Sequence, residues 1–98
     1  MEHLTYSNFI IVINDNKFGC LSKDGEEIAE LKYEDIAELY GDLIALKLNG
    51  KWGILNTKNE VIQPFKYDSI LTVNDDEAEA KLDGKTFRID YKGVATPK

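Results

Sequence analysis

Residues 43–56 read Leu-Ile-Ala-Leu-Lys-Leu-Asn-Gly-Lys-Trp-Gly-Ile-Leu-Asn, two short apolar runs around a central Asn-Gly pair. Asn-Gly tolerates the positive φ angles of a type I′ turn, so this stretch predicts a two-residue β-hairpin. The pattern occurs three times, because Lys17, Lys51 and Lys85 are 34 residues apart and each follows a turn pair. A fixed interval of this length indicates an internal structural repeat.

The repeat predicts one domain of 98 residues with units at about 9–42, 43–76 and 77–95. We expect an all-β antiparallel meander of about three hairpin repeats, forming a twisted β-sandwich or an open barrel-like sheet.

The segment 26–40 is ambiguous, because its apolar residues fall near helical spacing. An α+β fold with one helix near 26–40 is therefore the alternative. The equivalent segment of the next unit contains Pro64, which would disrupt a helix, and equivalent repeats should share a backbone. This favours a strand around 27–31, a turn near Glu34 and a strand around 35–39.

Two-residue turns fix the register of each hairpin and therefore which side chains share a face. One predicted face carries three equivalent pairs: Val12 with Gly19, Leu46 with Gly53, and Ala80 with Phe87. We expect this face to be core in all three hairpins. The other face changes from apolar in the first hairpin to polar in the third, where Glu79 lies opposite Arg88. The third hairpin therefore resembles a terminal cap, and the first should be covered on both faces, with Leu4 and Tyr6 as the candidate cover.

The chain has a net formal charge of −6. The negative charge is concentrated in its N-terminal part. Residues 1–42 carry 10 acidic residues and 3 lysines, a net charge of −7, whereas residues 43–98 carry 8 acidic and 9 basic residues, a net charge of +1. This argues against a nucleic-acid partner and suits a basic protein, although a solvated face that only maintains solubility is the plain alternative. The single cysteine and the lack of a long apolar run predict a cytoplasmic protein without a membrane partner.

At these positions the chain resembles the WG-repeat family. Three segments carry the likeness: Lys51-Trp52-Gly53-Ile54-Leu55, Glu60-Val61-Ile62-Gln63-Pro64 and Lys66-Tyr67-Asp68. The first unit has Phe18 in place of the family tryptophan, and the third has Thr86-Phe87 in place of Trp-Gly. The resemblance implies an all-β bacterial protein without shared catalytic chemistry. Similar units occur among small immunity proteins that neutralise polymorphic toxins.

The sequence predicts no catalytic residue, cofactor or metal site, so we expect a protein that is not an enzyme. Cys20 is interpreted as a small hydrophobic residue, and Trp52 as a packed aromatic rather than a binding anchor. Acidic residues recur at equivalent repeat positions beside tyrosines, which makes a usable surface for a basic partner. The predicted partner-binding residues are Tyr33, Glu34, Asp35, Glu38, Tyr40, Asp42, Tyr67, Asp68, Asp75 and Asp76. The leading hypothesis is an immunity-type inhibitor of a basic, nuclease-like toxin; the alternative is a scaffolding WG-repeat domain with no inhibitory role.

Overall fold

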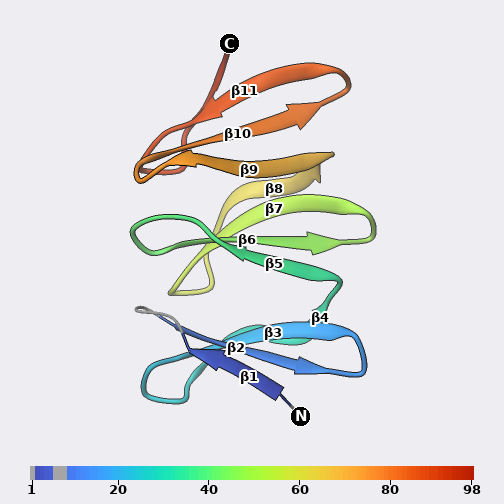
Figure 1. Cartoon of the computed structure of the whole chain (residues 1–98), viewed down its shortest axis with the longest axis vertical. Coiled ribbons are helices and arrows are strands. Elements are labelled where there is room, and N and C mark those ends of the chain that lie inside the picture. The colour runs from blue at the N-terminus through green and yellow to red at the C-terminus, as the bar shows by residue number, and fades with distance from the viewer. Residues whose placement is uncertain (1, 6–8) are drawn as a thin grey trace.

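A computed structural model describes residues 2–5 and 9–98, with side chains described from Phe9 onward. These residues form three four-stranded antiparallel sheets, each a simple meander, stacked along the 38 Å long axis of the molecule (Figure 1). Sheet 1 contains β1 (Glu2–Thr5), β2 (Phe9–Asn14), β3 (Lys17–Ser22) and β4 (Glu27–Tyr33). Sheet 2 contains β5 (Asp35–Glu38), β6 (Leu43–Leu48), β7 (Lys51–Asn56) and β8 (Val61–Tyr67). Sheet 3 contains β9 (Ser69–Asn74), β10 (Glu77–Leu82), β11 (Lys85–Ile89) and β12 (Ala95–Pro97).

The all-β prediction is confirmed, and none of the three sheets closes into a barrel. The alternative helix near 26–40 is wrong, because β4 and β5 occupy that segment. The chain bends at Glu34 and passes from sheet 1 to sheet 2 there; it repeats this step at Asp68 between sheets 2 and 3. The sheets are therefore offset from the sequence units, which begin one strand later.

The three hairpins have the predicted turns and register. Both central residues of each turn have positive φ: Asp15 and Asn16 (50° and 64°), Asn49 and Gly50 (55° and 80°), and Asp83 and Gly84 (52° and 80°). This backbone twist matches the twist of the flanking strands and explains the choice of Asp, Asn and Gly. The predicted pairs are observed as well: Val12 with Gly19, Leu46 with Gly53, and Ala80 with Phe87.

Two hydrophobic cores lie between the sheets, and sheet 2 contributes one face to each. In the first core, Ile11 and Cys20 of sheet 1 pack with Ile44, Leu46 and Leu55 of sheet 2. In the second core, the opposite face of sheet 2 packs on sheet 3, and its buried members include Ala45, Ile54, Ile70, Ala80 and Ile89. Alternation along each strand of sheet 2 sends successive side chains into different cores.

The prediction for the face of Val12, Leu46 and Ala80 is correct for two hairpins and wrong for the first. Leu46 and Ala80 are fully buried, whereas Val12 lies on the outer face of sheet 1 and belongs to neither core described. The reason is the direction of stacking: sheet 2 covers the face of sheet 1 that carries Ile11. The expected cover cannot be assessed from Leu4 and Tyr6, since the side chain of the first and all of the second lie outside the described residues.

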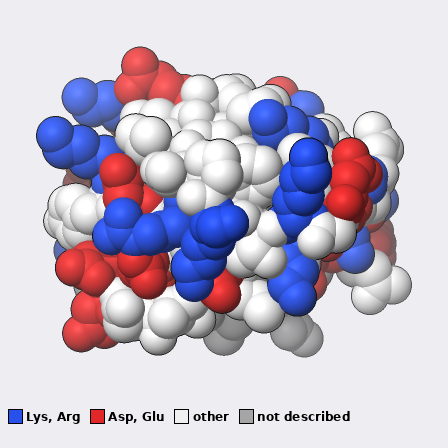
Figure 2. All heavy atoms as spheres, turned by 90° about the horizontal axis from the view of Figure 1, so that it is seen from above, with Lys and Arg blue, Asp and Glu red and all other residues white. Residues whose placement is uncertain are grey.

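The third hairpin forms the predicted cap. Its outer face is polar, and Figure 2 shows charged side chains of both signs across this end of the molecule. Glu79 and Arg88 lie opposite each other in the strand register, as expected, but their side chains do not form an ion pair with each other. Arg88 instead pairs with Glu77, and Glu79 lies 3.3 Å from the ammonium group of Lys98.

Candidate partner-binding surface

The ten predicted residues lie at two opposite edges of the stack. One edge, here called the turn edge, carries the turns 15–16, 49–50 and 83–84 and the two sheet crossings at Glu34 and Asp68; the other, the loop edge, carries the remaining described connections between strands (Figure 1). Tyr33, Glu34, Asp35, Tyr67 and Asp68 lie at or beside the turn edge, and the remaining five lie toward the loop edge. A single surface containing all ten is therefore excluded.

The acidic residues at the two sheet crossings form hydrogen bonds within the chain. The Glu34 carboxylate accepts hydrogen bonds from the amides of Asn49 (2.7 Å) and Gly50 (3.0 Å), the central residues of the next turn. Asp68 does the same one repeat later, accepting from the Asp83 amide (3.1 Å). Asp68 also accepts from the Lys51 ammonium group (2.5 Å), which lowers the pKa of this carboxyl. We call these two side chains the latches, because each ties a crossing to the following hairpin.

The two tyrosines beside the latches, which the sequence predicted as partner contacts, are core residues. Tyr33 and Tyr67 are only 6% and 2% exposed. The Tyr33 ring stacks on Phe65, and the Tyr67 hydroxyl donates to the Gln63 side chain (2.8 Å). Burial raises the pKa of both phenols. Their apolar rings fill the space between sheets.

Asp35 begins β5 next to the first latch, and its carboxylate accepts a hydrogen bond from the amide of Ile36 (2.8 Å). It is exposed, but it lies away from the loop edge. The acidic pair Glu34 and Asp35 therefore does not extend toward Asp42, as the linear sequence suggested.

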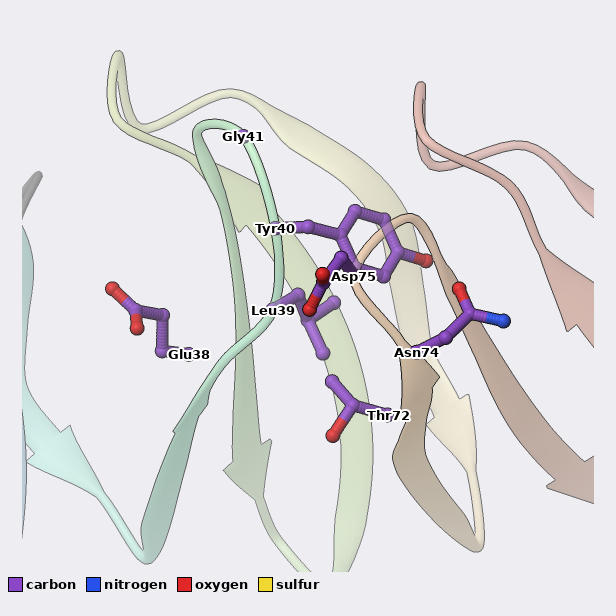
Figure 3. Close-up of a pocket in the computed structure, with 7 residues that line it drawn as sticks. All are labelled: Glu38, Leu39, Tyr40, Gly41, Thr72, Asn74 and Asp75. Atoms are coloured by element: carbon purple, nitrogen blue, oxygen red, sulfur yellow. The ribbon is translucent and has the colours of Figure 1, made fainter.

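The loop edge brings together predicted residues from two sheets. The loop 39–42 of sheet 2 lies beside the turn of sheet 3 that contains Asp75, and the two border a pocket of about 390 Å³ (Figure 3). The pocket is lined by Glu38, Leu39, Tyr40, Gly41, Thr72, Asn74 and Asp75. Figure 3 shows Glu38 at one side, Asn74 at the other, and Tyr40 and Asp75 between them. The lining is mostly polar and offers two carboxylates to a bound group.

Tyr40 forms a fixed wall of this pocket. Its hydroxyl donates to the carbonyl of Ile89 (2.8 Å), and its ring stacks on Tyr91 with centroids 6.1 Å apart. Burial raises its pKa to about 12, and the nearby carboxylates of Asp90, Glu77 and Asp76 add to the effect. The phenol is therefore neutral at physiological pH. The three carboxylates that raise its pKa also place negative charge near the pocket.

A second hollow of about 500 Å³ adjoins the pocket at Gly41, and its lining includes Lys23, Asp42 and Thr57. The five described connections at the loop edge carry seven acidic residues and three lysines. The acidic residues are Asp24, Glu26, Asp42, Glu60, Asp75, Asp76 and Asp90. At the turn edge, the hairpin turns and sheet crossings carry Asp15, Glu34, Asp68 and Asp83, and a lysine follows each hairpin turn. The formal charge of the loop-edge connections is therefore −4, against −1 for these turn-edge residues.

The sequence analysis missed a repeated polar residue that organises the loop edge. Ser22, Asn56 and Asp90 occupy equivalent positions 34 residues apart. Each side-chain oxygen accepts two loop amides, those of the residues two and four positions later. In the middle unit these distances are 2.9 Å and 3.0 Å. The 34-residue spacing of short polar residues before each turn was the available signal.

The remaining candidates have structural roles. Cys20 is buried, and burial raises the pKa of its thiol to about 11, so it is protonated at neutral pH and packs as a small hydrophobic residue. Trp52 packs against the second core opposite Lys47. Among the described residues, no group of three or more His, Cys, Asp or Glu side chains is arranged to hold a metal ion. The described part of the chain has no helix long and apolar enough to cross a membrane.

Comparison with known proteins identifies the repeat. No curated protein and no solved structure matched the chain. A family model described as "WG containing repeat" matches residues 18–52 and 52–85. These two consecutive matches cover most of the chain and meet within the central hairpin, at Trp52. The chain is a member of the WG-repeat family.

Proposed function

We propose that this WG-repeat domain is a non-enzymatic binding protein that takes a basic protein partner at its loop edge. The observation that supports it best is the pocket lined by Glu38, Tyr40 and Asp75 at that edge. Its two carboxylates suit the charged head of a partner's lysine or arginine, while Tyr40, which is only 7% exposed, supports the pocket from the core. Asp42 and Asp76, also on this edge, extend the field that would attract such a partner.

The more specific form of the proposal is an immunity-type inhibitor of a basic, nuclease-like toxin. A nuclease needs a basic cleft for its substrate, and an acidic surface that covers the cleft excludes the substrate by charge and by bulk. The occurrence of similar WG-like units among small immunity proteins is consistent with this form. Inhibition then requires only a complementary surface, and no catalytic group on the inhibitor.

The test is recovery of a basic protein from the native host at low salt, followed by an affinity measurement and a nuclease assay with the recovered protein. Three exposed acidic residues at the loop edge are neutralised together: Asp42→Asn, Asp75→Asn and Asp76→Asn. The matched control changes the charge equally elsewhere: Asp15→Asn, Glu30→Gln and Asp35→Asn. Attraction between opposite charges on exposed surfaces is screened by salt, so we expect binding to weaken as salt increases.

We expect the loop-edge variant to bind at least tenfold more weakly and the control to stay within about twofold of the original. Failure to recover any basic protein at low salt would remove the proposal. Equal weakening by both variants would mean that net charge, rather than this surface, governs association. Binding without nuclease inhibition would reject the inhibitor and leave a scaffolding role.

A further inference from the structure

Within residues 2–5 and 9–98, no sheet lies over the outer face of sheet 1, although this face is built like a core face. Ile10, Val12, Leu21 and Leu31 belong to neither core described, and Leu31 is 38% exposed. Every repeat equivalent of these four residues lies in a core. The equivalents are Ile44 and Ala78, Leu46 and Ala80, Leu55 and Ile89, and Phe65. The repeat thus builds the same apolar surface three times and covers it within the chain twice.

This uncovered face is also hollowed. A cavity of about 200 Å³ opens on it, and apart from Glu27 the described residues that line it are apolar or glycine. Neither equivalent glycine has free space directly above it: an added Cβ would lie 2.8 Å from the carbonyl oxygen of Ala29 at Gly19, and 2.8 Å from the Phe65 ring at Gly53. Sheet 1 has the smaller Leu31 at the position of Phe65. The hollow can therefore receive an aliphatic side chain from outside.

A second copy cannot cover this apolar face with its own opposite end, the outer face of sheet 3. A head-to-tail stack would place the cap face of sheet 3 on the apolar face, and that cap carries Glu79, Lys81 and Arg88 beside the exposed Leu71 and Val73. Burying these charges against aliphatic side chains would cost several kcal/mol per group. The same apolar face of another copy carries a smaller cost, since it brings aliphatic groups into contact on both sides and, among the described residues that line the hollow, only Glu27 is charged.

We propose that two copies of this chain associate face to face through the outer face of sheet 1, related by a two-fold axis. Self-complementary contact of one patch with itself is the usual geometry of a symmetric dimer. The polar cap of sheet 3 then lies at both outer ends, which closes the assembly at two copies. The dimer leaves the loop edge of each copy free, so its formation is independent of the proposed partner binding.

The size of the face sets the strength of the association. The two shorter dimensions of the molecule are 25 Å and 20 Å, so the end face has an area of about 500 Å². Two such faces bury about 1,000 Å² together, the lower limit for a specific interface. The dimer is therefore weak and exchanges rapidly, with a dissociation constant on the order of 100 µM.

The test is sedimentation equilibrium from about 5 µM to 1 mM with two matched variants, Leu31→Lys and Leu71→Lys. Both positions are exposed, at 38% and 67%, but Leu71 lies on β9 in sheet 3, at the other end of the stack. We expect a monomer–dimer equilibrium for the original chain, at least tenfold weaker association for Leu31→Lys, and an unchanged equilibrium for Leu71→Lys. Circular dichroism checks that each variant folds.

Thiol-specific cross-linking with a bifunctional reagent provides a second measurement that does not depend on the lysine variant folding. Such a reagent should join two copies of Leu31→Cys, which lies on the edge strand β4 of the proposed interface, and should not join two copies of Leu71→Cys. The native Cys20 does not interfere, because it is 1% exposed. A monomer at every concentration, dimerisation unaffected by Leu31→Lys, or equal cross-linking at both positions would each overturn the proposal. Species larger than dimers would refute the two-fold geometry.

Discussion

Substitution of Ile10 and Ile44 tests the assignment of faces directly, because the two residues are repeat equivalents with the same side chain. Ile44 is 0% exposed in the first core, whereas Ile10 is partly exposed on the outer face of sheet 1. Replacing a fully buried isoleucine with alanine removes three carbons and leaves a cavity, at a cost of about 2 to 5 kcal/mol. The same change at Ile10 should cost about 1 kcal/mol, since water already reaches the site and no closed cavity forms.

The measurement is equilibrium unfolding in urea at about 5 µM, far below the expected dimer dissociation constant, supported by thermal denaturation. A destabilisation of about 3 kcal/mol should lower the melting temperature of a chain of 98 residues by more than 10 °C. Ile44→Ala should show this loss, and Ile10→Ala should melt within about 8 °C of the original.

The Leu21 and Leu55 pair repeats the comparison at a second place, since Leu55 is 2% exposed in the first core and Leu21 lies on the outer face. Equal destabilisation within both pairs would refute the reasoning, because it would mean that the outer face of sheet 1 is buried within a single chain. Equal but small losses of unfolding free energy within both pairs would instead contradict the burial of Ile44 and Leu55 in the first core.

Two further measurements probe the loop edge. Asn56→Ala should destabilise the chain by about 1 to 2 kcal/mol, because Asn56 is 8% exposed and its side-chain oxygen accepts the amides of Lys58 and Glu60. Asn56→Ser keeps an acceptor, as the equivalent Ser22 does, and should lose less stability in urea unfolding; Asn56→Asp should not, because its carboxylate would replace the amide that donates to the Glu60 carboxylate (2.8 Å). For Tyr40, the folded-state pKa of about 12 exceeds the unfolded value near 10, so its stabilising contribution is complete below about pH 10 and is lost as the pH rises toward 12. Tyr40→Phe should therefore reduce the dependence of the melting temperature on pH between 10 and 12, and an unchanged pH dependence would show that this phenol does not titrate differently in the two states.

The hairpins, their register and the extended segment at 26–40 could be predicted because they depend on local chemistry. Asn-Gly, Asp-Asn and Asp-Gly pairs select the turn, and the turn alone fixes which residues face each other across the ladder. Pro64 then excluded a helix from one unit, and the repeat extended that conclusion to the unit without a proline. Each step used residues within one 34-residue unit.

The stacking direction could not be predicted, because it depends on how the chain turns at the single residue Glu34. Both faces of the first hairpin are apolar in sequence, so composition does not tell which one meets sheet 2. In the structure, sheet 2 covers the face that carries Ile11, so Ile11 is buried in the first core, and Ile10 and Val12 lie on the outer face of sheet 1. A face rich in aliphatic residues is compatible with burial within the chain and equally with burial by another chain.

The sequence predicted the partner-binding residues as one acidic strip beside the repeat tyrosines, whereas the structure places them in two groups at opposite edges of the stack. A count of charges does not distinguish a carboxylate that holds a backbone turn from one that faces solvent. Glu34 and Asp68 are each 15 residues before the turn that they bind, at Asn49 and Asp83. That repeated interval was present in the sequence, but its meaning depends on the sheet crossing that brings the two positions together.

The latches also determine how the molecule bears a load. β1 and β12 belong to sheets at opposite ends of the stack, so a pull on the two termini acts on the sheets in series (Figure 1). The backbone passes between neighbouring sheets at only one residue, and the latch fastens that residue to the next hairpin through hydrogen bonds that lie outside the cores. Tension therefore reaches each joint before it reaches the strand ladders beyond it, and the sheets should detach one at a time rather than all together.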